Sequence, residues 1–429
     1  MHATSLPLSR EFKAAVAAVS FLVTLQLTGC GDSMGSASSE SSAASGLDSS
    51  ADLTVKGEGT GDASAVAAAV AAGGMATVVG TGTGAGTSAA TVPGTPKGTG
   101  TGTGKATPAP VATGPASDHP FVAGVTAHMA WNISTSVVSA KLADLGTRSV
   151  RDEAYWAAYE RQKGVYDIRG LSASIQEAMT GKFDVSNSVL VLDYGNPLYR
   201  KGARPITDDV IEGFVNYAVN VIKDGGWRWG FIQVWNEWNL PMRENGETVD
   251  GNAADYARLF KAVAQAIRPL GNFKILTQGS IDRFNGYGHQ KELVAHGVLK
   301  YADGFGHHSY NWGHRELATP DRLITRLHEI QAFLTEANGG KPFPIYITEF
   351  GWPGYNNAGF NEQQIGPYIS QFIKQTKALS WVKGVWLYNL FDKGTDLNNP
   401  ESGFGIYGPN GQEKMRTQYI REAMRAANS

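Results

Sequence analysis

The chain has 429 residues, of which 42% are apolar and 10% aromatic, so it can bury one large core or two ordinary ones. Its formal net charge is only -2 and its Lys and Arg residues are scattered singly, so nucleic acid is not an expected partner. A single cysteine excludes an internal disulfide framework and a cysteine-based zinc site.

The first thirty residues have the build of a secretion signal. Arg10 and Lys13 precede an apolar run over residues 14–27, which is short for a membrane span and suits a signal peptide. The run ends in the tetrapeptide Leu-Thr-Gly-Cys at Cys30, which resembles the bacterial lipobox. This resemblance implies that residues 1–29 are removed and that Cys30 carries the lipid; the alternative is an ordinary signal peptide followed by a stray cysteine.

The residue after Cys30 is Gly31. By resemblance to lipoprotein sorting, the lack of Asp at this position implies the outer membrane, and triacylation would give a stable anchor. We therefore expect a cell-envelope protein that is bound to the membrane through its lipid.

Residues 30–117 are rich in Gly, Ser, Thr and Ala and almost free of aromatic residues. Such a composition cannot bury enough apolar surface to offset its ordering entropy. We interpret it as a flexible tether that carries a catalytic domain over residues 118–429.

From residue 118 onward, short β-branched or aromatic runs alternate with helical stretches, which is typical of repeated βα units. Eight strands are predicted, over Phe121–Ala127, Ser149–Asp152, Ser188–Asp193, Phe231–Trp235, Phe273–Thr277, Gly304–His308, Ile345–Thr348 and Gly384–Tyr388. Helices are predicted over Asp208–Lys223, Ala253–Ile267, Pro320–Thr335, Glu362–Lys377 and Gln412–Ala427. The pattern favours a (β/α)8 TIM barrel, with a doubly wound open sheet as the alternative; the latter lacks its glycine fingerprint here.

Two carboxylates follow predicted strands at matching positions. Glu237 comes after strand four and Glu349 after strand seven. A carboxylate directly after an apolar strand is costly unless it lies in a functional cleft, and strand ends form the active-site face of a barrel. Glycoside hydrolysis needs such a pair, with about 5 to 5.5 Å between the carboxyls for retention and about 6.5 to 9.5 Å for inversion. We expect the shorter separation.

The runs around these two residues, Trp-Asn-Glu-Trp-Asn and Ile-Thr-Glu-Phe-Gly-Trp, resemble clan A glycoside hydrolases. The resemblance implies that Glu237 is the acid/base and Glu349 the nucleophile. Within the clan, Arg-Asp-Glu at 151–153 and the Leu-Asp-Tyr-Gly-Asn turn at 192–196 are similar to family 39, with families 5 and 51 as neighbours.

The same resemblance implies further substrate-binding roles. Asn236 would bind the sugar 2-hydroxyl, or else be a turn residue, and Arg151 would hold Glu349 ionised, or else pair with Asp152 or Glu153. His308 and Tyr310 match a His-x-Tyr motif whose tyrosine touches the nucleophile. Trp386 would stack under the sugar ring, or else pack inside the barrel. Weaker candidates for substrate contact are His128, Trp131, Tyr194, Asn196 and Trp352.

No metal or other cofactor is expected, because the adjacent residues His307 and His308 point to opposite faces of a strand. The expected function is an endo-acting, retaining β-glycosidase on an extracellular polysaccharide, such as the biofilm exopolysaccharides cleaved by some family 39 enzymes. Alternatives are an exo-acting, β-xylosidase-like enzyme, transglycosylation at the same site, a catalytically silent carbohydrate-binding lipoprotein, and an adhesion or surface-assembly protein.

Overall fold

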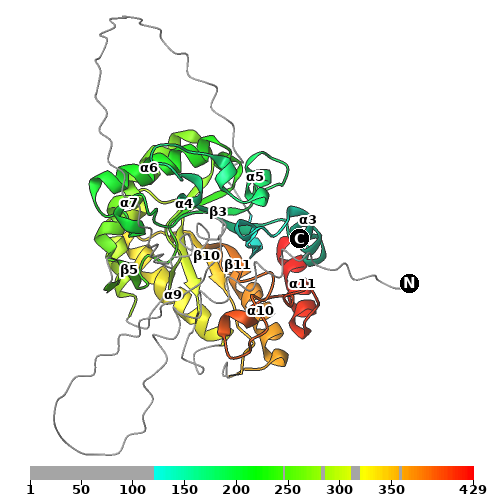
Figure 1. Cartoon of the computed structure of the whole chain (residues 1–429). Coiled ribbons are helices and arrows are strands. Elements are labelled where there is room, and N and C mark those ends of the chain that lie inside the picture. Colours follow the sequence, from blue (N-terminus) through cyan, green and yellow to red (C-terminus); the bar gives the residue numbers. More distant parts are fainter. Residues whose placement is uncertain (1–119, 245–246, 282–285, 311–318, 357–359) are drawn as a thin grey trace, which may run out of the picture.

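The computed structural model describes residues 120–244, 247–281, 286–310, 319–356 and 360–429. The expected signal peptide, Cys30 and the expected tether lie outside these ranges. The remainder folds as a (β/α)8 barrel, as the sequence predicts, with strands at the centre and helices around them (Figure 1).

The barrel strands are all parallel and include each of the eight predicted ones. In chain order they are β1 (Val122–Thr126), β2 (Val150–Tyr155), β3 (Val189–Asp193), β4 (Phe231–Val234), β7 (Lys274–Leu276), β8 (Ser280–Ile281), β9 (Phe305–Ser309), β10 (Ile345–Phe350) and β11 (Val382–Leu387).

The fifth barrel strand is interrupted. Its first part, β7, pairs with β4, and its second part, β8, pairs with β9. Isolated bridges complete the contacts on both sides: Leu276, at the end of β7, pairs with Gly304 just before β9, and Asn236, after β4, pairs with Gly279 just before β8. The two halves of the sheet therefore meet, and the barrel closes at this strand.

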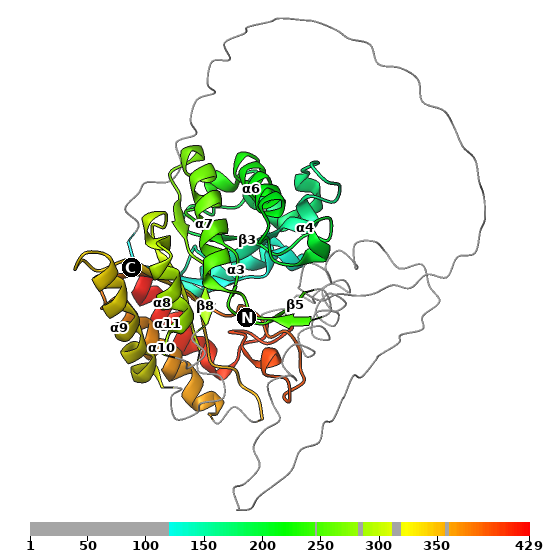
Figure 2. The same cartoon turned by 90° about the vertical axis from the view of Figure 1, so that its left-hand side faces the viewer.

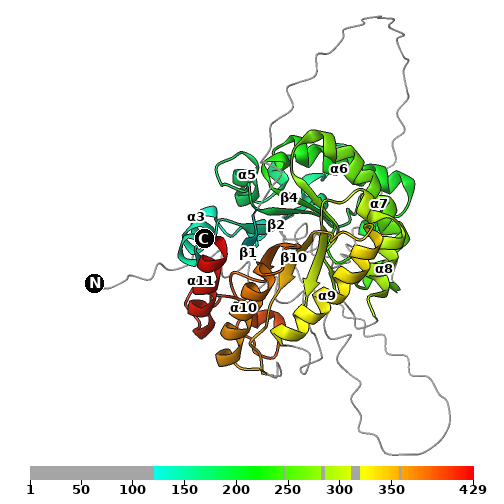
Figure 3. The ribbon, with the colours of Figure 1, turned by 180° about the vertical axis from the view of Figure 1, so that it is seen from behind.

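Helices cover the outside of the sheet in chain order, as the view from behind shows (Figure 3). They are α3 (Thr135–Leu145), α4 (Trp156–Tyr159), α5 (Ala173–Met179), α6 (Asp208–Lys223), α7 (Ala253–Ile267), α8 (Gly288–Ala295), α9 (Pro320–Ala337), α10 (Glu362–Lys377) and α11 (Met415–Asn428). Within the described residues, none of them combines the length and apolar character needed to cross a membrane.

Local sequence explains where the long helices begin. The Asn361 side chain accepts from the backbone of Gln364, whose own side chain accepts from the Asn361 backbone, forming a capping box at α10. Thr319 caps α9 ahead of Pro320, which suits the first helical position. The start of α6 carries two aspartates, which favour the positive end of the helix dipole.

Two apolar regions hold the domain together. The larger one fills the layer between sheet and helices, and the smaller one lies inside the barrel. The inner cluster consists of Val122, Val189, Val191, Phe231, Leu276, Tyr346 and Trp386. Because these side chains plug the barrel interior, a site can form only beyond them, at the carboxyl ends of the strands.

A short hairpin follows β4 outside the barrel. It pairs β5 (Met242–Glu244) with β6 (Glu247–Val249) and lies apart from the barrel sheet (Figure 2). Arg204 anchors it, because its guanidinium donates to Glu244 at 2.6 Å and to the Val249 carbonyl at 3.1 Å.

Candidate active site

The two glutamates reach the barrel mouth through irregular backbone. Trp235 and Glu237 have φ values of 67° and 47°, in the left-handed region that side chains rarely adopt. On β10, Tyr346 points into the barrel, so simple alternation would turn Glu349, three residues later, outward. A register shift against β9 between Ile347 and Glu349 brings that side chain to the mouth instead.

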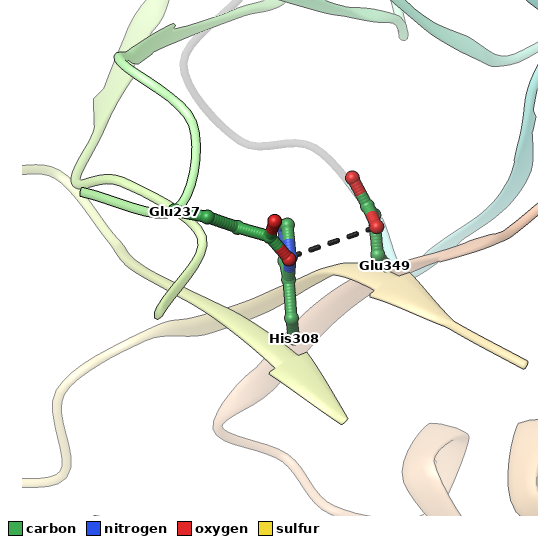
Figure 4. A group of neighbouring side chains, drawn as sticks. All are labelled: Glu237, His308 and Glu349. Carbon is green, nitrogen blue, oxygen red and sulfur yellow. Dashed lines mark hydrogen bonds and ion pairs between the residues drawn. The ribbon is translucent and has the colours of Figure 1, made fainter. Parts of the chain in front are cut away.

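The carboxylates of Glu237 and Glu349 face each other beside the imidazole of His308 (Figure 4). Nδ1 of His308 lies 2.8 Å from Glu237 and 3.6 Å from Glu349. One ligand atom from each of the three residues lies within 4.8 Å of the others. The two carboxylates thus approach each other through oxygens that are closer than the ~6.5 to 9.5 Å between carboxyls that would admit an inverting water.

Arg151, on β2, links Glu349 to Asn236, which follows β4. One guanidinium nitrogen lies 2.9 Å from Glu349, and another donates to the Asn236 side chain at 2.8 Å. The Asn236 amide in turn donates to the Tyr194 hydroxyl at 2.8 Å. Of the two pairings considered for Arg151, the structure has the one with Glu349. Because Arg151, Asn236 and Tyr194 are joined by hydrogen bonds, each of these groups is held in position by its neighbours.

Tyr310, at the end of β9, donates its hydroxyl to Glu349 at 3.0 Å. Burial and the charge of Glu349 raise the pKa of Tyr310 well above its usual value, so the hydroxyl keeps its proton. His308 and Tyr310 thus lie on one face of the chain and contact the two glutamates, whereas His307, which precedes them, is buried away from the mouth.

The surroundings move the pKa values of the two glutamates in opposite directions. Burial raises the pKa of Glu237, and the charge of Glu349 adds to this, although His308 and Arg151 oppose it. Burial would also raise the pKa of Glu349, but the charges of His308 and Arg151 and the Tyr310 hydrogen bond outweigh it and lower it. Near neutral pH, Glu349 is therefore ionised while Glu237 can carry a proton.

A glycine makes room for His308. The imidazole lies so close to Gly279, in the gap between β7 and β8, that a Cβ at this position would be 1.8 Å from Nε2. The interruption of the fifth strand thus gives the histidine its place next to Glu237.

Glu237, His308 and Glu349 are also of the residue types that bind divalent cations. The carboxylate oxygens, however, are already bound, Glu237 by His308 and Glu349 by Arg151 and Tyr310. A guanidinium bound to Glu349 competes with a cation for the same carboxylate, so the donor set fits proton chemistry better than metal binding.

Three of the predicted substrate contacts are wrong. Trp386 is fully buried in the inner cluster against Phe231 and Tyr346, and its indole donates to Ser149 at 2.8 Å. Its side chain points into the barrel, but one layer below the mouth, where no sugar can reach it.

The other two wrong predictions concern residues in loops. The Asn196 amide donates to the Glu160 carbonyl at 2.8 Å and its oxygen accepts from the Leu198 backbone at 2.9 Å, so this residue shapes a turn. Trp352 is buried against Phe350 and Phe372, in the layer under α10. In both cases the chain turns the side chain away from the mouth.

His128 lies at the edge of the site, where its ring contacts Trp131 and Asn389. Its ring stacks on Trp131 with 3.7 Å between centroids, and its Nε2 lies 3.3 Å from the Asn389 amide. Burial and the charges of Lys393 and Arg151 lower the pKa of His128 well below its usual value, so the ring is neutral. Asp152 holds this loop, because its carboxylate accepts from the backbone of Met129 at 2.6 Å and of Ala130 at 2.9 Å.

Two residues at the mouth escaped the sequence-based prediction. Tyr388 follows β11, two positions after Trp386, and is half-buried beside His128 and Tyr310. Glu153 follows Arg151 by two positions on β2 and is also half-buried. Alternation along a strand was the signal that could have identified both. The peptide bonds Asp193-Tyr194 and Tyr388-Asn389 are cis.

No family model and no curated protein sequence matches this chain. Solved structures do. A family 39 glycoside hydrolase from the gut symbiont Bacteroides cellulosilyticus WH2 is 17% identical with a TM-score of 0.59; the match covers 72% of this chain and 64% of that one. This chain thus spans less than two thirds of that enzyme's length.

Two further structures are GH5_18 proteins. One, from Streptomyces cattleya in complex with GlcNAc, is 16% identical with a TM-score of 0.55 over 72% of this chain and 81% of that one. The other, from Bifidobacterium longum subsp. infantis, is 12% identical with a TM-score of 0.56 over 72% and 79%. The chain therefore shares the barrel fold of these glycoside hydrolases.

Proposed function

We propose that this protein is a retaining glycoside hydrolase. Glu349 attacks the anomeric carbon and forms a glycosyl-enzyme ester while Glu237 protonates the departing oxygen. Esterification removes the charge of Glu349, which lowers the pKa of Glu237, and Glu237 then takes a proton from the water that releases the sugar. Asn236 is the contact to the sugar 2-hydroxyl, and Arg151, His308, Tyr310 and Tyr194 position the reacting groups.

One observation carries this proposal above all others. Two carboxylates from different strands meet within 4.8 Å at the mouth of a barrel, and their pKa values are displaced in opposite directions. A stability role would not need this arrangement, because bringing like charges together in a buried site is unfavourable. Glu237 keeps 21% of its side chain exposed, so an incoming sugar can reach it.

The substrate we propose is an extracellular polysaccharide that is cut internally at β-linkages. The lipobox-like sequence at Cys30 and the Gly- and Ser-rich stretch behind it support a lipid-anchored enzyme at the outer membrane, held away from the bilayer by a tether. A polymer outside the cell suits such an enzyme better than a small imported glycoside.

A polysaccharide panel tests the proposal. Purified protein and a Glu349→Gln variant are incubated with neutral, amino-substituted and acidic polysaccharides and with aryl glycosides, and new reducing ends are counted. We expect shortened chains with the wild type and at least about a 10³-fold lower rate with the variant. Cleavage of aryl glycosides without shortening of any polymer would overturn the endo-acting part. Equal binding by both proteins with no turnover on any substrate would instead identify a carbohydrate-binding protein.

A further inference from the structure

Strand β2 presents different chemistry on its two faces. Arg151, Glu153 and Tyr155 alternate toward the mouth, whereas Asp152 points outward and caps the loop after β1. The mechanism proposed above uses Arg151 but gives Glu153 no task. A half-buried carboxylate next to a catalytic pair is unfavourable unless something binds it.

Glu153 is held in place on one side only. The Tyr155 hydroxyl donates to its Oε2, and the Trp131 indole donates to Tyr155 at 2.9 Å. This chain of donors fixes the carboxylate at the mouth. None of the ion pairs within the described ranges includes Glu153.

The cations near Glu153 are bound to other carboxylates. Arg151 contacts Glu349 and Asn236, and Lys393 lies 2.9 Å from Glu401. On the neighbouring strand β3, in register with Tyr155, Asp193 is fully buried, and its burial together with the charge of Glu153 raises the pKa of Asp193 well above its usual value. Burial raises the pKa of Glu153 as well, but the charge of Arg151 and the Tyr155 hydrogen bond oppose this rise. Of the two carboxyls, the fully buried Asp193 therefore keeps a proton more readily, and Glu153 is the one that ionises more readily.

A carboxylate in this position accepts hydrogen bonds and cannot donate them. Sugar hydroxyls and protonated amines are donors, whereas the ionised carboxylate of a uronic acid has no proton to offer and carries the same charge as Glu153 and Glu349. Charge repulsion in a partly desolvated cleft is strong, and an unmatched carboxylate would add its desolvation cost.

We propose that Glu153 is a specificity-determining residue of the subsite in which the sugar is cleaved: it accepts a hydrogen bond from a hydroxyl or ammonium group on the ring, so that the subsite takes neutral and amino sugars and excludes uronic acids. This inference rests on the glycosidase function proposed above, and it narrows the substrate to a polymer without acidic residues at the point of cleavage.

The test compares three substrate classes on wild type and Glu153→Gln. The classes are β-glucosides, β-glucosaminides and β-uronides, each used both as 4-nitrophenyl glycosides and as β-1,4-linked hexasaccharides. For the wild type we expect kcat/KM on the best neutral or amino substrate to exceed that on the uronide by roughly 100-fold or more. In the variant, kcat/KM on that substrate should fall by about 10- to 100-fold. The ratio of kcat/KM on that substrate to kcat/KM on the uronide should fall at least about tenfold.

Comparing the glucosaminide with the glucoside shows whether Glu153 accepts its hydrogen bond from an ammonium group or from a hydroxyl group. A larger loss on the glucosaminide than on the glucoside identifies ammonium recognition, and equal losses identify a hydroxyl contact. Glu160→Gln serves as the control, because Glu160 is a fully buried carboxylate from the same part of the chain that binds Trp156 and Gly164 away from the mouth. It should lower the unfolding temperature without changing the substrate ratio.

A ratio in Glu153→Gln within about threefold of the wild type would overturn the inference, as would a wild type that cleaves uronides as well as neutral sugars. If hydrolysis is abolished by Glu349→Gln and the ratio is unaffected by Glu153→Gln, the glycosidase stands and only the role of Glu153 fails. If the wild type cleaves nothing in either format, both proposals fail together.

Discussion

The interior of the barrel and its mouth are built from the same strands but have opposite chemistry. On β11, Trp386 lies inside the barrel against Phe231, and Tyr388, two residues later, lies at the mouth. On β10, Tyr346 belongs to the apolar interior, and Glu349 is part of the charged network above it. On each strand, only two or three positions separate a side chain that packs inside the barrel from one that belongs to the candidate site.

This difference shows how the fold separates stability from function. The interior is regular and apolar, and it closes the barrel below the site. The mouth carries the left-handed backbone at Trp235 and Glu237, the register shift before Glu349 and buried charges, all of which are unfavourable locally. The predictions below test whether substitutions inside the barrel mainly lower stability and substitutions at the mouth mainly lower activity.

The largest effect is expected at the mouth, from Glu237→Gln. Without its acid, the enzyme should lose about 10²- to 10⁴-fold in kcat on polysaccharide, because the departing sugar oxygen needs a proton. The first step on a 2,4-dinitrophenyl glycoside should be nearly unaffected, since this leaving group departs unprotonated. Single-turnover kinetics on both substrates measure the contrast, and an equal loss on both would refute the role of acid.

Trp386 and Tyr388 form a matched pair across the boundary. Trp386→Ala empties the barrel interior and should lower the free energy of unfolding by about 3–5 kcal/mol, as large-to-small core substitutions do. Tyr388→Ala should cost less stability but reduce kcat/KM by roughly tenfold, because Tyr388 lines the mouth. Denaturant unfolding and steady-state kinetics distinguish the two. A stable Trp386→Ala variant that has lost sugar binding would restore the stacking role.

Gly279→Ala probes the mouth through its backbone. The added methyl group would occupy the space of the His308 imidazole, so the histidine must move away from Glu237. A misplacement of about 1 Å can cost up to about 10²-fold in rate, and we expect a loss of this order with little change in KM. Gly339→Ala provides a comparison, because its Cβ would meet nothing within 4 Å although its φ of 66° is strained. Equal kinetics in the two variants would refute the steric role of Gly279.

The pH dependence of kcat/KM should be bell-shaped. Glu349 must be ionised, so activity falls as the pH drops through its lowered pKa; Glu237 must be protonated, so activity falls as the pH rises through its raised pKa. Each limb should change about tenfold per pH unit. The alkaline limb should be absent in Glu237→Gln, and its persistence there would assign it to another group.

Much of the fold could be predicted from the sequence, because periodic patterns are long and repeated. All eight predicted strands exist, and α6, α7 and α10 have the predicted bounds. The interruption of the fifth strand was not predicted, since Gly279 and its polar neighbours look like a turn. The β5–β6 hairpin is too short and polar to show a strand pattern.

The site was less predictable, because alternation gives the face of a side chain but not its depth. The family resemblance placed Trp386 at the mouth, with packing inside the barrel as the alternative, and the structure has it one layer below the mouth. Glu153 was considered only as a partner for Arg151, although it shares the face of that residue. The register shift before Glu349 has no local sequence signal; the place of this carboxylate at the end of an apolar strand and the resemblance around it indicated that it faces the site, but not how the chain turns it there.

The most direct test of the central claim is the stereochemistry of the first product. When the hydrolysis of a β-linked substrate is followed by proton NMR from the first turnover, two carboxylates this close should yield the β-anomer first, with the α-anomer appearing only by mutarotation. Initial release of the α-anomer would mean that water, rather than Glu349, attacks the sugar, and would contradict the proposed mechanism.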